Sequence, residues 1–69
     1  MATMTDLDKL RMLLPHWIEH NAEHAGEFSA WAEKARAAGQ ADAAATIEKA
    51  AAQLGEVNET LNAALKALG

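Results

Sequence analysis

The sequence lacks cysteine altogether. Without thiols the chain forms no disulfide, and it offers no thiolate ligand to a zinc site or an iron–sulfur cluster. A chain of 69 residues is one small domain, and domains of this size usually depend on disulfides, a metal or a partner chain for stability. We therefore expect support from a metal held by histidine and carboxylate side chains, or from association with another chain.

Basic residues and long apolar runs are also scarce. Six Lys and Arg residues stand against ten Asp and Glu residues, for a formal net charge of -4. Nucleic acid is therefore not an expected partner, because phosphate contacts need clustered basic side chains. No stretch approaches the roughly 20 apolar residues that span a bilayer, and the acidic start lacks the apolar run of a signal peptide. The sequence predicts a soluble cytoplasmic protein that does not contact membranes.

Helix-breaking residues are few, with one proline and four glycines. The strongest break is Ala37-Ala38-Gly39-Gln40. Gly39 suits the left-handed position that ends a helix, and Asp42 places an acid in the first turn of the next one. The short connection predicts an all-α fold, an antiparallel two-helix hairpin that forms a single domain over residues 1–69. Helix one is expected over about residues 5–38 and helix two over about residues 41–68.

Pro15 interrupts the predicted first helix and leaves two alternatives open. Thr5 and Asp8 have the spacing of a capping pair, so a short helix can begin there, and Pro15 can open the main helix at its first position. Alternatively, one helix runs through Pro15 with a kink. The apolar register continues past Pro15, which favours the kink.

Apolar side chains recur every seven residues along both predicted helices, which is typical of packed helices. In helix two the repeat consists of Ile47, Leu54, Leu61 and Leu68, and Asn58 is the polar residue that interrupts the stripe. Helix one has three such rows, the third at the edge: Leu10, Trp17, His24 and Trp31; Leu7, Leu14, Asn21, Phe28 and Ala35; and Leu13, His20, Glu27 and Lys34.

Two helices cannot enclose all of these apolar side chains, so an isolated hairpin would expose a large apolar patch, and such patches mark interfaces. The simplest arrangement that would bury this patch is a homodimer with twofold symmetry that forms a four-helix bundle. The alternative is that the hairpin is one half of a larger chain. The residues expected at the interface are Trp17, Phe28, Trp31, Leu54, Leu61 and Leu65.

All three histidines lie in helix one at four-residue spacing, as His16, His20 and His24. Successive members of such a set differ by about 40° around a helix, so they form a slowly turning stripe. Two histidines one turn apart can hold a single metal ion. The preferred ligand set is His20, His24 and Glu27, and a second set nearer solvent is His16, His20 and Glu23.

The predicted surroundings of these histidines strengthen the case for a metal site. We expect the His24 imidazole to point inward between Trp17 and Trp31, with Gly55 on the opposite helix making room for the ring. The competing interpretation is that the histidines are simply hydrogen-bonded or solvated. Both interpretations remain open.

Two asparagines are expected to meet across the hairpin, because Asn21 falls opposite Asn58 when the chain turns near Gly39. Asn58 could orient a histidine as an outer-shell partner of a metal site. An Asn pair in a helical seam also fixes register and oligomeric state, and this structural role is favoured here.

No catalytic arrangement is evident, so the chain is not expected to be an enzyme. There is no Ser–His–Asp set, glycine-rich phosphate loop or paired buried acid. A di-iron bundle needs Glu-x-x-His on facing helices, whereas the order here is His-x-x-Glu. The best-supported function is a transition-metal-binding module in homeostasis or delivery of nickel, cobalt or zinc. The alternative is a docking or oligomerisation hairpin that uses no metal.

One segment also resembles a known type of domain. The run Leu13-Leu14-Pro15-His16-Trp17-Ile18-Glu19-His20-Asn21-Ala22-Glu23-His24, followed by Phe28 and Trp31-Ala32, resembles a small prokaryotic helical domain associated with nickel-binding proteins of the carbon monoxide dehydrogenase accessory type. The resemblance implies nickel or cobalt handling, with His16, His20 and His24 as the matching positions. The β module that precedes the helical tail in those proteins has no counterpart here.

Overall fold

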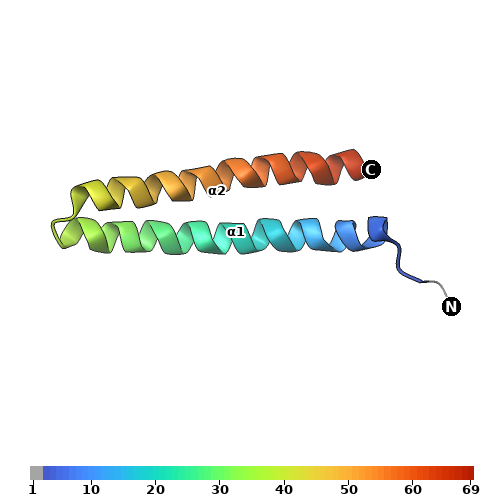
Figure 1. Cartoon of the computed structure of the whole chain (residues 1–69), viewed down its shortest axis with the longest axis horizontal. Helices are drawn as coiled ribbons and strands as arrows, with labels where there is room; N and C mark the ends of the chain where they lie inside the picture. Colours follow the sequence, from blue (N-terminus) through green and yellow to red (C-terminus); the bar gives the residue numbers. More distant parts are fainter. Residues whose placement is uncertain (1–2) are drawn as a thin grey trace.

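The computed structural model describes residues 3–69, so Met1 and Ala2 of the predicted domain lie outside the described residues. The chain folds into two antiparallel helices, α1 (Asp6–Ala37) and α2 (Ala41–Leu68), which lie side by side along their length (Figure 1). The predicted all-α antiparallel hairpin is confirmed. Neither helix in the described part of the chain combines the length and the apolar character that crossing a membrane requires.

The start of α1 is fixed by a reciprocal cap between Thr5 and Asp8. The Thr5 hydroxyl accepts a hydrogen bond from the Asp8 N–H at 3.1 Å, and the Asp8 carboxylate accepts one from the Thr5 N–H at 3.1 Å. These bonds satisfy backbone donors that have no partner within the helix. The bond from the Thr5 backbone also favours the ionised carboxylate, so it lowers the pKa of Asp8 below the ordinary value.

Pro15 lies inside α1, which is continuous from Asp6 to Ala37. The alternative in which Pro15 opens a separate helix is therefore not realised. Proline removes the donor that would bond to the carbonyl of Arg11, but Arg11 is exposed and water can take that place. Leu14, buried at 4 % exposure, and the half-buried Ile18 pack on α2 on either side of the proline, which helps to keep the helix in one piece.

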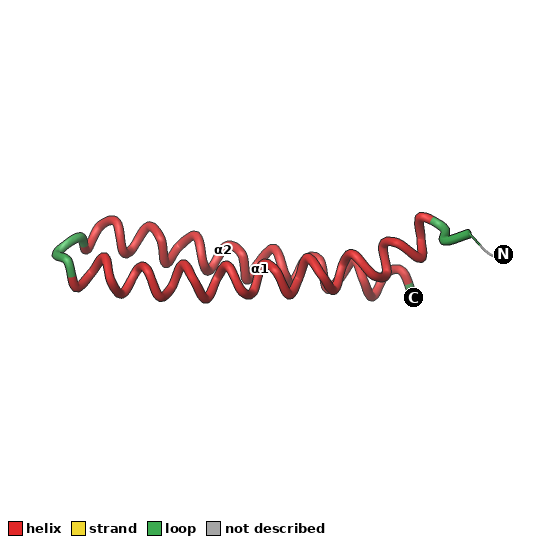
Figure 2. Tube along the Cα trace, turned by 90° about the horizontal axis from the view of Figure 1, so that it is seen from below, coloured by secondary structure: helices red, strands yellow, loops and turns green. Residues whose placement is uncertain are grey.

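The turn between the helices depends on Gly39, whose φ of +82° is the left-handed conformation expected from the sequence. The Gly39 N–H donates to the carbonyl of Arg36 at 3.0 Å, and the Gln40 N–H donates to that of Ala35 at 2.9 Å. This pair of bonds is a Schellman motif, which satisfies the last carbonyls of α1. The turn is the short green segment at one end of the hairpin in Figure 2.

Arg36 joins the two helices close to this turn. Its guanidinium donates to Glu33 on α1 and to Glu48 on α2, both at 2.7 Å. The Glu48 carboxylate is the main reason that the pKa of Arg36 is raised above its ordinary value. The group is exposed, so this bridge contributes chiefly to the geometry of the turn region.

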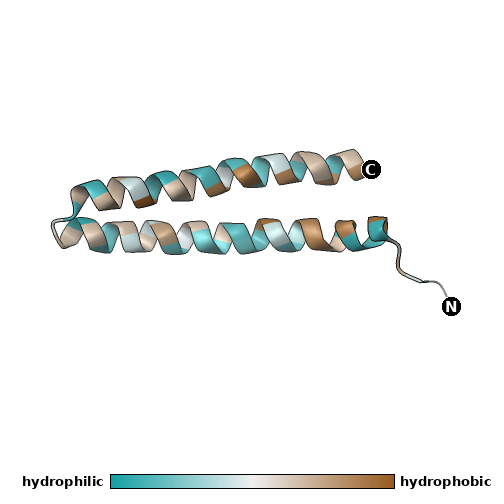
Figure 3. Cartoon of the chain, in the orientation of Figure 1, coloured by the Kyte–Doolittle hydropathy of each residue, from teal (hydrophilic) through white to brown (hydrophobic). Residues whose placement is uncertain are grey.

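The seam between the helices contains one polar pair and otherwise apolar residues. In Figure 3 the brown, hydrophobic bands of α2 lie on the side that faces α1. Near the turn the seam is lined by alanines, of which Ala32 and Ala44 are fully buried. Toward the chain ends it is lined by leucines. The seam residues are Leu14, Ile18, Asn21, Ala25, Phe28, Ala32 and Ala35 from α1, and Ala44, Ile47, Ala51, Leu54, Asn58, Leu61, Leu65 and Leu68 from α2.

The hairpin is an elongated rod with extents of 59 × 22 × 11 Å. Its radius of gyration is 16.4 Å, whereas a compact chain of this length would have about 11 Å. One layer of two helices covers only one side of each, so only Leu14, Ala32 and Ala44 are buried among the apolar residues of the described chain. A single copy therefore has little core of its own to stabilise it.

Candidate functional site

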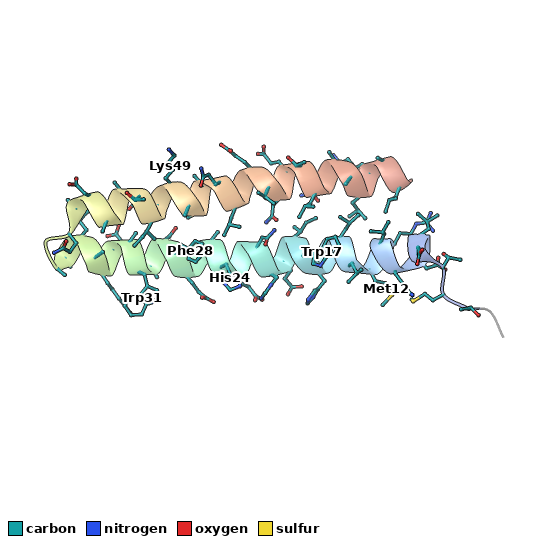
Figure 4. The ribbon with its side chains drawn as sticks, in the orientation of Figure 1. Met12, Trp17, His24, Phe28, Trp31 and Lys49 are labelled. Atoms are coloured by element: carbon teal, nitrogen blue, oxygen red, sulfur yellow. The ribbon has the colours of Figure 1, made fainter. Side chains whose placement is uncertain are left out.

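His20 and His24 belong to a mostly exposed surface of α1. Two rows of side chains run along this side of α1, and Figure 4 shows His24 and Trp31 on the side of α1 away from α2. Every member is exposed except His24, which is half-buried. We call this surface the outer face of α1; it consists of Leu10, Trp17, His24 and Trp31 in one row and Leu13, His20, Glu27 and Lys34 in the other.

The sequence prediction that His24 points inward between tryptophans is wrong for the single hairpin. The His24 side chain is 41 % exposed, and Trp17 and Trp31 are 41 % and 61 % exposed. The seam is instead formed by the row that contains Leu14, and His24 and Trp31 lie on the side of α1 away from α2 (Figure 4). Gly55 does not make room for the ring either, because a Cβ at Gly55 would meet nothing within 4 Å.

The three imidazoles form a ladder on α1. The ring centroids of His20 and His24 are 4.4 Å apart in an edge-on arrangement at 64°. Those of His16 and His20 are 6.1 Å apart, with the rings nearly parallel at 10°. The Glu27 carboxylate lies 3.7 Å from Nδ1 of His24, which is close but too long for a hydrogen bond. His20, His24 and Glu27 are thus the most closely gathered of the predicted ligands.

One chain does not complete a metal centre. Within residues 3–69 no three His, Asp or Glu side chains are gathered so that they could hold one ion. The second predicted set is looser, because the ring centroids of His16 and His20 are 6.1 Å apart. The arrangement therefore offers one pair of adjacent imidazoles with a carboxylate nearby, and further ligands must come from water or another molecule.

Asn21 and Asn58 lie opposite each other, as the sequence register predicts. The Asn21 side-chain amide donates to Oδ1 of Asn58 at 3.1 Å, and the Asn58 amide donates to the backbone carbonyl of Ile18 at 2.9 Å. Both side chains are half-buried. Asn58 thus contacts an asparagine and the backbone of α1, and among residues 3–69 it does not hydrogen-bond to the histidines. The pair fixes the register of the seam, and the expected role of orienting a histidine is not what the structure shows.

The predicted interface residues fall into two groups. Phe28, together with Leu54, Leu61 and Leu65, is half-buried in the seam of one chain. Trp17 and Trp31 are exposed on the outer face, and the Lys34 ammonium lies 4.2 Å from the ring centroid of Trp31. Leu10 and Leu13, which are not among the predicted interface residues, are 37 % and 40 % exposed on the same face. The seven-residue spacing that links Leu10 to Trp17 was the available signal.

A surface hollow near the start of α1 lies apart from the histidines. Its lining consists of Met4, Lys9, Met12 and Leu13. The hollow is open to solvent, and the described histidines and asparagines do not line it. It therefore adds nothing to the candidate metal ligands.

A protein-family model matches most of the chain. The model of the Domain of unknown function (DUF8180) matches residues 10–68, which include nearly all of both helices, the histidine ladder and the asparagine pair. The chain belongs to this family. The expected resemblance to a small helical domain is confirmed to that extent, and the DUF8180 description names no ligand. No curated protein and no solved structure matches the chain.

Proposed function

We propose that this DUF8180 hairpin binds a divalent transition metal ion through His20 and His24 and acts in the homeostasis or delivery of that metal. The observation that carries the proposal is the 4.4 Å separation of the two imidazole centroids. Two histidines one helical turn apart on a solvent-accessible face can bind one ion, and imidazole suits nickel, cobalt, zinc and copper.

The surroundings of the pair support a cation. Glu27 lies 3.7 Å from His24, and Glu23 is exposed on the same stretch of α1. With a formal charge of -4 the whole chain also attracts divalent cations. Metal binding requires deprotonated imidazoles, so the affinity should fall as the solution is acidified.

Calorimetric titration of chelator-stripped protein with nickel, cobalt and zinc tests the proposal. Saturable binding is expected, and a free metal concentration one hundred times the Kd should stabilise the fold by about 2.7 kcal/mol. A His20→Ala/His24→Ala variant should lose both effects. His16→Ala is the matched control, because His16 is farther from its neighbour; this variant should keep the binding. If none of the three metals binds, the proposal is refuted.

A second candidate function is docking without metal, and the exposure of Trp17 and Trp31 favours it. Large exposed aromatic side chains mark interaction surfaces. Under this alternative the histidines only complete the surface. The double histidine variant would then associate as the unaltered chain does, whatever the metal content of the solution.

A further inference from the structure

We propose that a second copy of this chain covers the outer face of α1, packed antiparallel, and that the two copies hold one divalent transition metal ion between four imidazoles. These imidazoles are His20 and His24 of each copy. The inference rests on the proposed function and adds to it the partner and the ligand set.

The exposed area of the outer face fits a protein interface. Trp17 and Trp31 are 41 % and 61 % exposed, which together amounts to about one whole tryptophan side chain, roughly 250 Å². A standard interface buries about 800 Å² on each partner. The tryptophans thus supply about a third of the area, and Leu10, Leu13 and the imidazole faces add to it.

The outer face is complementary to itself in one antiparallel register. When two copies of α1 cross with Ala22 level with Ala22, residues whose numbers are equally far from 22 meet. Trp31 then packs on Leu13 of the second copy, and His24 meets His20. Lys34 covers Leu10 with its aliphatic stem, while its ammonium reaches the edge. A shift by seven residues in one direction would carry Leu10 and Leu13 beyond the facing helix. A shift in the other direction would leave Trp31 against Asp6, the first residue of that helix, and carry Lys34 beyond it.

The same register completes the metal centre that one chain lacks. His20 and His24 lie two residues on either side of Ala22, which is about 3 Å along a helix at 1.5 Å per residue. Four imidazoles are thereby brought to within about 3 Å of the twofold axis, measured along the helix. A tetrahedral ion such as zinc needs four ligands with Zn–N distances of about 2.0–2.1 Å. One chain gathers no set of three ligands in residues 3–69, so the second copy supplies what is missing.

Charge explains why the metal and the pairing depend on each other. Glu23 is one residue from the axis level and Glu27 is five residues from it, so two copies bring four carboxylates toward the centre. Each chain has a formal charge of -4, and like charges in contact oppose association. A divalent cation at the centre offsets this repulsion. Metal should therefore strengthen the dimer, and by linkage dimerisation should strengthen metal binding.

Sedimentation of the full chain with and without zinc is the first test. Zinc should lower the dimer dissociation constant at least about tenfold and saturate at one ion per two chains, and the His20→Ala/His24→Ala variant should not respond. Saturation at one ion per monomer would overturn the four-imidazole site while leaving the proposed function intact. Dimerisation without any metal binding would refute both. A chain that stays monomeric with zinc would overturn the second copy as the occupant and assign the face to a different protein.

Two equally exposed side chains provide matched variants for the contact. Trp31 is 61 % and Met12 is 62 % exposed, but only Trp31 belongs to the outer face. Trp31→Glu should raise the dimer dissociation constant by more than about tenfold, whereas Met12→Glu should leave it within about twofold. Circular dichroism checks that both variants remain helical. Equal effects of the two substitutions would contradict the proposed surface.

Cross-linking tests the orientation, because the chain has no cysteine of its own. A Leu10→Cys/Lys34→Cys variant should form disulfide-linked dimers in the antiparallel register. Each single variant should not, since equivalent residues of the two copies would lie about 36 Å apart along the helix. Rapid cross-linking of the single variants would indicate parallel helices and overturn the register.

Discussion

Replacing Asn58 should show how much the Asn21–Asn58 pair in the seam contributes to the free energy of unfolding. Asn58 makes two hydrogen bonds, one from Asn21 at 3.1 Å and one to the Ile18 carbonyl at 2.9 Å. At about 1 kcal/mol net for each, Asn58→Leu should lower the free energy of unfolding by about 2 kcal/mol. The Asn21 amide would be left half-buried without its partner. For a domain of this size the melting temperature should fall by about 8–16 °C.

The double variant Asn21→Leu/Asn58→Leu should behave differently, because it removes both polar groups at once. Replacing both partners by apolar groups is nearly neutral or stabilising, so the double variant should be at least as stable as the original chain. Urea unfolding followed by circular dichroism, at fixed protein concentration and with chelator present, gives the coupling between the two sites. If the losses in the free energy of unfolding caused by Asn21→Leu and Asn58→Leu alone simply add in the double variant, the pairing is not the source of the effect. A looser register in the double variant is also expected.

Substitutions at the helix cap, at two glycines and at Pro15 should also change the stability of the hairpin. Thr5→Ala should cost about 0.5–2 kcal/mol through loss of the hydroxyl that caps the Asp8 N–H. The pKa of Asp8 is lowered in the folded chain chiefly by the Thr5 backbone N–H, so the carboxylate half of the cap stabilises the fold above the ordinary value of 3.8 and is lost as the pH falls through the lowered pKa. Because Thr5→Ala keeps that backbone donor, melting curves at neutral and acid pH should show both proteins losing stability on acidification. Gly39→Ala should destabilise the chain by about 1 kcal/mol because φ is +82° there. Gly55→Ala lies inside α2 with nothing within 4 Å of the new Cβ, so it should stabilise the chain by about 0.5–1 kcal/mol. If urea unfolding shows that both substitutions change the free energy of unfolding in the same direction, this reasoning is wrong. Pro15→Ala should stabilise the exposed middle of α1 by up to about 3 kcal/mol, and a lower melting temperature would show that proline is needed for the shape of the helix.

Much of the fold was predictable because local chemistry determines it. Gly39 marks the turn through its backbone freedom, and Thr5 with Asp8 marks the start of α1. Asn21 and Asn58 were matched across the hairpin by counting from the turn. These features depend on a few neighbouring residues or on a fixed helical rise, so a single sequence contains them.

The choice of the face that packs on α2 was not predictable in the same way. Two rows of α1, one with Leu10, Trp17 and His24 and the other with Leu14, Asn21 and Phe28, have the same seven-residue spacing and one polar residue each. The large aromatic side chains of the first row favoured it as the buried one. The small residues Ala25 and Ala32, which allow the helices to approach closely, favour the second. A tertiary contact decided between two equivalent local patterns, and the interpretation of His24 changed with it.

The distribution of alanine and leucine along the seam has a consequence for how the hairpin closes. Contacts next to the turn link residues that are near in sequence, so they cost little loop-closure entropy, but alanines make them and each buries little surface. The leucines, which bury more, meet only when the two chain ends come together. Hairpin closure that starts at Gly39 thus gains little stabilising free energy until the leucines meet. Both helices therefore pack in one cooperative step. Trimming a few residues from the leucine end should weaken the hairpin more than shortening it at the turn.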